Sequence, residues 1–494
     1  MSYLLTIDQS TSATKVMLFD RNAELTNRVS LPHKQYYPQS GFVEHDPEEI
    51  FSNTLSGIGQ VIQLSGIDES EIVCIAITNQ RETAMIWDHT TGIPVCNAAV
   101  WQCQRGVEYC NLLKKANKGP LIQDKTGLII DPYFSASKLK WMVDHVEGVR
   151  EKMKEGVLLA GTMDSWLLWK LTGGRVHATD YSNASRTMLL NLETRDWDDE
   201  LIELFSLDRQ MLPLLVYSDE IAGTTDPSVI FENSIPIAGL MGDSHAALFG
   251  QNCFSPGMAK ATYGTGSSIM MNIGNKPLPP PDGLVTSVAW GRGKAVDYVF
   301  EGNIHCTGDT INWLVNDLQL IGSAAETESL ATSVDGNNGV YLVPAFVGLG
   351  APYWDNNARA AISGMPRDTK KAHVVRAALE SIAYQVKDLV DLMGSGAQIS
   401  LKELRVDGGP TRNNFLMQFQ ADMLGNSIVR THIEEISALG SAFMAGLATG
   451  FWNSMDEISN LRLVDRTFIP DMEAGQVKEL YAGWLTAVKR VQLT

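Results

Sequence analysis

Two turns rich in glycine and small hydroxyl residues are the parts of this sequence best suited to chemistry. An apolar run enters each turn and another leaves it, at residues 6–18 and 261–271, which predicts two hairpins that offer backbone N–H groups to an anion. The candidate phosphate-binding residues are Ser10, Thr11, Ser12, Lys15, Gly264, Thr265 and Gly266. Either turn alone is typical of an ordinary hairpin, but the pair predicts one phosphate site between two halves. A P-loop is excluded, because the only Gly-Lys pair, Gly293-Lys294, precedes Ala295.

A third glycine turn follows the predicted strand at residues 404–406. It reads Asp407-Gly408-Gly409, and Asn413 opens the next predicted helix. Bare glycine backbone at a strand-to-helix turn lets a flat ring lie close, with the Asn side chain as donor or acceptor. A structural turn with a helix cap explains the same residues equally well, so both interpretations stay open here.

An acid and a polar run stand where predicted strands end. Asp243 lies between an apolar strand and an apolar helix start, where it is either a helix cap or a general base for an attacking hydroxyl. Arg81 and Glu82 lie in the run 79–83 that follows the buried strand at 72–77. This run is either a solvated loop or a site that donates to and accepts from the hydroxyls of a polyol.

The elements that position these residues alternate between strand and helix, which predicts an α/β fold. Strands are expected at residues 4–6, 15–19, 28–31, 72–77, 236–240, 404–406 and 428–430. A helix is expected from Pro47, which follows the capping residue Asp46. Further helices are expected at 137–145, 163–171, 308–317, 373–393, 413–424 and 437–448. The similar hairpins suggest two related halves, with a boundary near residues 250–257.

Composition limits the classes of protein that fit. A chain of 494 residues, 44% of them apolar, predicts at least two domains. The net charge of −18 disfavours nucleic acid and anionic membranes as partners. The six cysteines form no CxxC pair and the N-terminus lacks the features of a signal peptide, so we expect a cytoplasmic protein. The uncharged stretch 436–455 is rich in small and polar residues, which favours a buried helix over a membrane span.

Longer motifs resemble the FGGY family of carbohydrate kinases, and most closely its glycerol kinases, from Leu5 to about Val488. They are Asp8-Gln-Ser-Thr-Ser, Gly41-Phe-Val-Glu-His-Asp-Pro, Thr78-Asn-Gln-Arg-Glu-Thr, Val100-Trp-Gln-Cys, Asp131-Pro-Tyr-Phe-Ser-Ala-Ser-Lys-Leu-Lys-Trp, Asp180-Tyr-Ser-Asn-Ala-Ser-Arg-Thr-Met-Leu, Ala261-Thr-Tyr-Gly-Thr-Gly and Pro344-Ala-Phe-Val-Gly-Leu-Gly-Ala-Pro-Tyr-Trp-Asp. The resemblance implies two actin-like (ribonuclease H-like) domains with a cleft between them. Residues 1–250 would bind a small polyol or sugar, and residues 251–494 would bind ATP. A homo-oligomer, a dimer or a tetramer, is also expected.

The resemblance also implies a role for each candidate. Asp243 would be the general base, and Asp8 would help to hold Mg²⁺. The substrate pocket would be lined by Arg81, Glu82, Trp101 and Tyr133. The phosphates would lie between the two hairpin turns, and the adenosine would contact Gly308, Asn312, Gly408, Gly409 and Asn413. Phosphoryl transfer needs mainly positioning and charge stabilisation, which such a set supplies.

Departures from the family pattern bear on the acceptor and on regulation. Ser244 stands where glycerol kinases usually have Gln, and Ser268 where they have Phe, so we expect a larger, more polar pocket. This favours a four- or five-carbon polyol or ketose, such as erythritol, xylulose or ribulose, as an alternative to glycerol. Ser10 replaces a usual Gly and keeps a hydroxyl for phosphate. The loop 225–234 lacks Arg, so regulation by a sugar bisphosphate is not expected.

A function of another class fits part of the sequence. An actin-like ATPase that serves as a filament or chaperone switch would also need the glycine turns and Asp8. It would not need the polar run at 79–83, Trp101 or Tyr133, which therefore favour the kinase.

Overall fold

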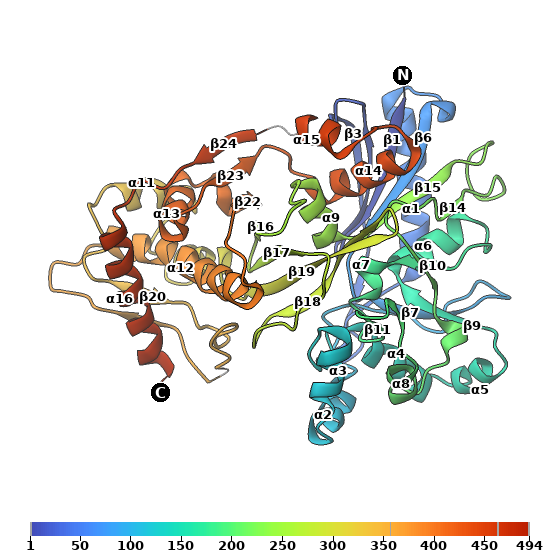
Figure 1. Cartoon of the computed structure of the whole chain (residues 1–494), viewed down its shortest axis with the longest axis horizontal. Coiled ribbons are helices and arrows are strands. Elements are labelled where there is room, and N and C mark those ends of the chain that lie inside the picture. The colour runs from blue at the N-terminus through green and yellow to red at the C-terminus, as the bar shows by residue number, and fades with distance from the viewer. Residues whose placement is uncertain (1, 356, 462–463, 493–494) are drawn as a thin grey trace.

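A computed structural model describes residues 2–355, 357–461 and 464–492. The chain folds into two α/β lobes, each built around its own large sheet (Figure 1). Strands and helices alternate along both halves of the chain, as the sequence predicts.

The first sheet has the strand order β14 (Gly223–Thr224), β15 (Pro236–Gly242), β6 (Ile72–Asn79), β1 (Tyr3–Gln9), β2 (Ala13–Phe19), β3 (Leu25–Pro32). β1, β2 and β3 form an antiparallel meander, and β6 lies parallel to both β1 and β15. The central strand β6 is a nearly continuous apolar run because both of its faces are covered. The predicted first hairpin is therefore confirmed as β1–β2.

The second sheet repeats this plan. Its order is β18 (Val285–Arg292), β19 (Ala295–Ile304), β17 (Ser267–Gly274), β16 (Met258–Tyr263), β22 (Glu403–Asp407), β23 (Ile428–Thr431), β24 (Val464–Phe468). β16, β17 and β19 are antiparallel neighbours, and β22 lies parallel to both β16 and β23. The second predicted hairpin is β16–β17, so the weak repeat in the sequence corresponds to two sheets that share this strand arrangement, with β18 as an added edge strand in the second.

The remaining elements surround these sheets. In the first half they are β4 (Gln35–Tyr36), β5 (Glu44–His45), α1 (Pro47–Ser65), β7 (Ala84–Asp88), β8 (Ala98–Ala99), α2 (Val107–Lys115), α3 (Gly119–Thr126), α4 (Ser135–His145), α5 (Val149–Lys154), β9 (Leu158–Thr162), α6 (Met163–Leu171), β10 (Ala178–Asp180), α7 (Tyr181–Ala184), β11 (Leu190–Asn191), β12 (Asp196–Trp197), α8 (Asp199–Leu204), β13 (Leu214–Val216) and α9 (Asp243–Gly250). In the second half they are α10 (Gly308–Asn316), α11 (Glu326–Thr332), β20 (Tyr341–Val343), β21 (Ala361–Ser363), α12 (Lys371–Ala397), α13 (Asn414–Leu424), α14 (Ile436–Thr449), α15 (Met455–Leu461) and α16 (Ala474–Gln492).

The start of α1 shows how local signals fix these bounds. The Asp46 side chain accepts a hydrogen bond from the Glu48 N–H at 2.9 Å, and Pro47 occupies the first helical position. The helix ends at Gly66, whose φ of 64° suits a residue without a Cβ. The helix buries Ile50, Phe51 and other apolar residues, as predicted.

Helix α14 comes from the second half of the chain but packs against α9 and the strands β6 and β15 of the first sheet (Figure 1). Small residues are needed here because the backbones nearly touch: a Cβ on Gly440 would lie 1.8 Å from the Ala246 carbonyl oxygen. The predicted buried helix at 437–448 is thus confirmed. Among the described residues, no helix is both long and apolar enough to cross a membrane.

Candidate active site

Three parallel strands end side by side and bring the candidate chemistry together. The register pairs Gln9 of β1 with Asn79 of β6, and Asn79 with Gly242 of β15. Asp8 lies at the end of β1, Arg81 follows β6, and Asp243 follows β15. The carboxyl edge of a parallel sheet commonly binds ligands, and here it gathers two acids and a guanidinium.

Asp243 is the first residue of α9, as the sequence predicts. Its Oδ1 accepts a hydrogen bond from the Ser244 N–H at 2.6 Å and lies 3.3 Å from the Nε of Arg81. The side chain is still 37% exposed, whereas that of Arg81 is only 6% exposed. The carboxylate is therefore fixed by one hydrogen bond and one ion pair but open to an incoming hydroxyl.

Arg81 and Glu82 are buried, so the solvated-loop interpretation of this run is wrong. Arg81 donates two hydrogen bonds to Glu301, at 2.8 and 2.9 Å, and Glu82 accepts one from Arg186 at 2.5 Å. Glu82 adopts a φ of 61°, which is uncommon for a residue with a side chain. The sequence pattern predicts neither partner, although Arg186 lies in the motif Asp180–Leu189.

Trp101 and Tyr133 form an aromatic wall beside these charges. Their ring centroids are 5.7 Å apart with an edge-on arrangement, and the Trp101 Nε1–H donates to the Thr11 hydroxyl at 3.0 Å. The loop that carries Tyr133 is held by Lys138, a residue also missed from sequence. The Lys138 ammonium donates to the carbonyl oxygens of Pro132, Tyr133 and Phe134. Burial lowers the pKa of Lys138 to about 8.

The first hairpin turn is braced from within. The Ser10 hydroxyl donates to the Ala13 carbonyl at 2.8 Å, so it closes the turn, while Ser12 is exposed. Lys15 lies opposite Asp8 in the register, 3.9 Å from its carboxylate, and donates to Glu435 at 2.7 Å. Burial raises the pKa of Asp8 to about 7; Lys15 opposes this rise, whereas Asp243 and Glu435 add to it.

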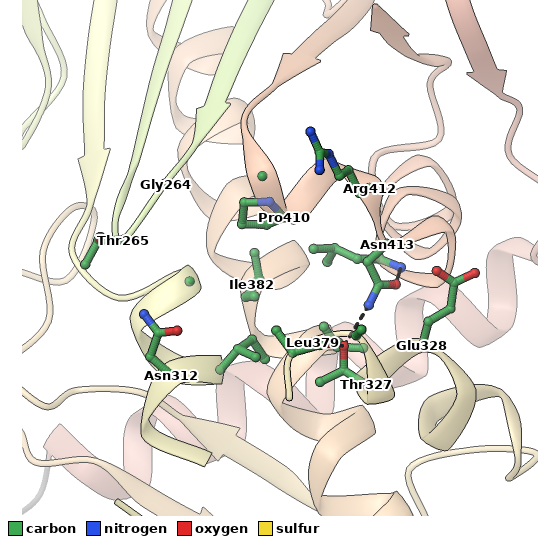
Figure 2. A pocket seen from close by; sticks show the side chains of 16 residues that line it. Gly264, Thr265, Asn312, Thr327, Glu328, Leu379, Ile382, Pro410, Arg412 and Asn413 are labelled. Carbon is green, nitrogen blue, oxygen red and sulfur yellow. Dashed lines mark hydrogen bonds between the residues drawn. The ribbon is translucent and has the colours of Figure 1, made fainter. Parts of the chain in front are cut away.

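The second hairpin opens onto a cavity of about 540 Å³. Figure 2 shows Gly264, Thr265 and Asn312 along one side and Asn413, Thr327 and Glu328 along another. The cavity also has an apolar lining, formed by Ile311, Leu379, Ile382, Pro410 and Leu416. Six predicted nucleotide residues line this cavity: Gly264, Thr265, Gly308, Asn312, Gly409 and Asn413.

The turn after β22 confirms the capping interpretation and also places Asn413 in the cavity lining. Asn413 does cap α13, because its Oδ1 accepts from the Leu416 N–H at 3.0 Å. Its amide nitrogen donates to the Thr327 hydroxyl at 3.0 Å, inside the cavity (Figure 2). Gly408 has a φ of 97°, and a Cβ there would lie 2.0 Å from the Tyr263 carbonyl oxygen. Only glycine lets β22 turn so close to β16.

The two serines that depart from the family pattern lie near this site. Ser244 follows Asp243 on α9 and is partly exposed. Ser268 pairs with Thr262 and Asn303 across the sheet, and its buried hydroxyl has no hydrogen-bond partner among the described residues. Gly266 packs against the Ile304 and His305 carbonyl oxygens, which fixes the hairpin to β19.

Comparison with known proteins finds relatives along almost the full length of the chain. Models of the FGGY family of carbohydrate kinases match at residues 3–250 for the N-terminal domain and 259–449 for the C-terminal domain. The chain is 50% identical over 490 residues to "Glycerol kinase 2" of Thermotoga maritima, covering 99% of each chain. It is 52% identical over 490 residues to "Glycerol kinase 1" of the same organism, again covering 99% of each chain.

Solved structures share the fold. Plasmodium falciparum glycerol kinase with ADP superposes with a TM-score of 0.95 at 35% identity, covering 99% of this chain and 98% of that one. A ligand-bound xylulose kinase from Lactobacillus acidophilus gives a TM-score of 0.88 at 22% identity, covering 99% and 98%. The prediction of an α/β fold with two actin-like domains is confirmed. With both family models matching in order along one chain, the protein belongs to the FGGY family of carbohydrate kinases.

Proposed function

We propose that this chain transfers the terminal phosphoryl group of ATP to a hydroxyl of a small polyol, with glycerol as the first candidate. The observation that carries the proposal is the partly exposed Asp243 carboxylate, held 3.3 Å from Arg81 at the edge where three parallel strands end. Glycerol kinases that are 50 to 52% identical over 490 residues support the choice of acceptor. Acceptor-dependent release of ADP from ATP tests the proposal, and a chain indifferent to every polyol contradicts it.

In the proposed reaction, Asp243 accepts the proton of the attacking hydroxyl. The Ser244 N–H and Arg81 Nε hold its carboxylate in place, so little reorganisation is needed as the proton moves. Arg81 and Glu82 bind the remaining hydroxyls as donor and acceptor, and Trp101 and Tyr133 cover the carbon chain. Closure of the two lobes excludes water and limits wasteful hydrolysis of ATP.

The nucleotide is proposed to lie across the second lobe. The adenosine occupies the 540 Å³ cavity, whose apolar lining suits a flat ring. The phosphates extend toward the two hairpin turns, where Gly264, Thr265 and Gly266 offer backbone donors. Thr11, Ser12 and Lys15 face them from the first lobe, on the turn that the Ser10 hydroxyl closes.

Mg²⁺ fits the acidic end of this site. Asp8 is a buried carboxylate whose charge is only partly balanced by Lys15, and Asp243 lies close enough to raise its pKa. Mg²⁺ prefers one or two carboxylates together with water and phosphate oxygens. Among the described residues, no cluster of three or more His, Cys, Asp or Glu side chains could hold a metal ion. When bound, Mg²⁺ would supply positive charge to the phosphate oxygens, and Asp8 would help to hold it.

A second acceptor class is supported by Ser244 and Ser268. Both side chains are small, and the Ser268 hydroxyl has no hydrogen-bond partner among the residues described, so a longer acceptor would supply one. The discriminating measurement is kcat/KM for glycerol, erythritol, erythrulose, xylulose and ribulose in one ADP-release assay. A higher value for glycerol than for all the others rejects the four- or five-carbon acceptor.

The same assay separates the kinase from an actin-like ATPase switch. A switch hydrolyses ATP at a rate that no polyol changes. We further propose that residues 1–250 and 251–494 form the substrate and ATP domains of a cytoplasmic homo-oligomer. Light scattering after size-exclusion chromatography measures its subunit number, and a monomer contradicts the oligomer.

A further inference from the structure

The motif Asp180–Leu189 has no role in the proposed reaction, yet it contains Arg186, a charged side chain that is only 2% exposed beside the site. We propose that Arg186 and Glu301 are positioning residues that hold Arg81 and Glu82 in the arrangement that binds the acceptor. The inference rests on the proposed function and adds two residues to it. The four side chains are called the charge quartet below.

Arg186 is fixed on three sides. Its Nε donates to Glu82 Oε1 at 2.5 Å, and its NH1 lies 3.0 Å from Glu301 Oε2. Its guanidinium lies over the rings of Phe134 and Tyr133, at 5.0 and 5.7 Å from their centroids. Only 2% of its side chain is exposed, so these protein contacts set its position. Arg186 therefore connects the acidic and the aromatic parts of the acceptor site.

Glu301 reaches the quartet from the other half of the chain. It lies on β19, where alternate residues face opposite sides: a Cβ on Gly302 would meet Leu389 of α12 at 3.2 Å, whereas Glu301 meets Arg81. It accepts two hydrogen bonds from Arg81 and faces Arg186 as well. Burial alone would raise the pKa of Glu301, but Arg186 and Arg81 hold that pKa well below its usual range.

Hydrogen bonds of the residues just before Arg186 fix its position beside the site. The Ser182 hydroxyl accepts from the Gly242 N–H at 2.9 Å, directly before Asp243. Asn183 exchanges hydrogen bonds with Asn79 at 3.0 and 3.1 Å, directly before the run that carries Arg81. The Ser185 hydroxyl accepts from the Val288 N–H of β18 at 3.0 Å. The short helix α7 thus contacts both lobes and the two strand ends that carry the acceptor site.

The quartet is electrically balanced, with two guanidinium groups and two carboxylates. Removing Arg186 leaves Glu82 and Glu301 buried with Arg81 as their only guanidinium partner in the quartet. An uncompensated buried charge is costly, so Arg81 or a carboxylate must shift or change its protonation. Removing one charge of each sign restores the balance. Recovery of activity in the charge-balanced variant therefore distinguishes loss of charge balance from general damage to the fold.

The test compares R186M, E301Q and the double variant R186M/E301Q with the wild type, using ADP release with the best acceptor of the panel. R186M is expected to lower acceptor kcat/KM about 100-fold, because it breaks a buried pair. The KM for ATP should stay within about threefold, because the nucleotide cavity is lined by other residues. The double variant should recover about tenfold over R186M, because it is neutral again.

Arg105 offers a matched control. It too is a buried arginine, with one carboxylate partner, Glu44, at 2.6 Å, and it lies over Phe42 and Trp141 at 4.8 and 4.7 Å from their centroids. R105M should therefore cost stability comparable to that of R186M but leave acceptor KM within about twofold. If R186M does not fold, E301Q alone must raise acceptor KM while leaving ATP KM unchanged.

Each outcome either supports or overturns the positioning role. Acceptor constants of R186M or E301Q that match the wild type overturn the inference, and so does a double variant no better than R186M. An equal loss for acceptor and ATP also overturns it, because that indicates general damage to the fold. A wild-type chain that releases no ADP with any polyol overturns the proposed function, and the positioning role with it.

Discussion

The Nε atom of Arg81 lies 3.3 Å from Oδ1 of Asp243, which joins the run after β6 to the first turn of α9. The NH1 and NH2 groups of the same guanidinium each donate one hydrogen bond to Glu301, which leaves one N–H on each of them. One buried side chain thus connects the proposed base, the acceptor site and the second lobe.

Replacing Asp243 by Asn should abolish most phosphoryl transfer while ATP still binds. Asn keeps the shape and can accept from the Ser244 N–H, but it cannot accept the substrate proton. We expect kcat to fall about 1000-fold, within the range for loss of a general base. Turnover and nucleotide binding are measured on the same preparation. D199N, at an α8 carboxylate with 84% exposure, is the control and should change nothing; near-normal turnover of D243N rules out this base.

Enlarging Ser268 to Phe should shift acceptor preference toward glycerol. The ring fills space beside Asn303 on the face of β17 and β19, so a longer acceptor loses room. We expect the ratio of kcat/KM for glycerol to that for a five-carbon acceptor to rise about tenfold. S268A removes the hydroxyl without filling space and serves as the comparison. An unchanged ratio in S268F shows that Ser268 does not border the acceptor.

Replacing Asn413 by Ala should weaken ATP binding as well as the fold. The change removes the cap of α13 and the hydrogen bond to Thr327, with a stability loss of about 1 kcal/mol. KM for ATP should rise while acceptor KM stays constant. D46A removes the equivalent cap of α1, so it should cost similar stability with no change in ATP KM. If neither variant changes the KM for ATP, Asn413 is only a helix cap.

The stability of the chain should depend on pH through Asp388. This buried carboxyl accepts hydrogen bonds from Tyr353, Tyr481 and Trp484, which join α12 to α16 and to the loop before β21. Burial raises its pKa to about 6, although the three hydrogen bonds oppose the rise. The native state therefore favours the protonated form. Its contribution is complete below the unfolded pKa of 3.8 and is lost as the pH rises through about 6.

Urea unfolding of D388N and the wild type at pH 4.5 and 7.5 checks this sign. Asn cannot ionise, so the stability of D388N relative to the wild type should improve by about 2 kcal/mol at the higher pH. A relative stability that does not change with pH excludes Asp388 as the titrating group. The comparison between variants cancels the other buried carboxyl groups.

The sequence by itself determined the local structure. Both hairpins, the strand-to-helix turn at Gly408 and the cap at Asp46 occur where the pattern predicts them, because each depends on neighbouring residues. The motifs also indicated the family. Asp243 could be named as a cap or a base from its place between a strand and a helix, whereas Asp8 was named through the resemblance. Their chemical roles remain predictions that the variants above test.

Only the tertiary structure decided which charges meet. Glu301 lies 220 positions from Arg81, Arg186 lies 104 positions from Glu82, and Glu435 lies 420 positions from Lys15. Charged residues carry no periodicity that reveals a distant partner, whereas apolar residues carry the periodicity of their strand or helix. Their pairing depends on strand order and on α14 crossing to the first sheet. The sequence therefore determined the elements and the candidate base, while packing of the two lobes decided what holds the acceptor site together.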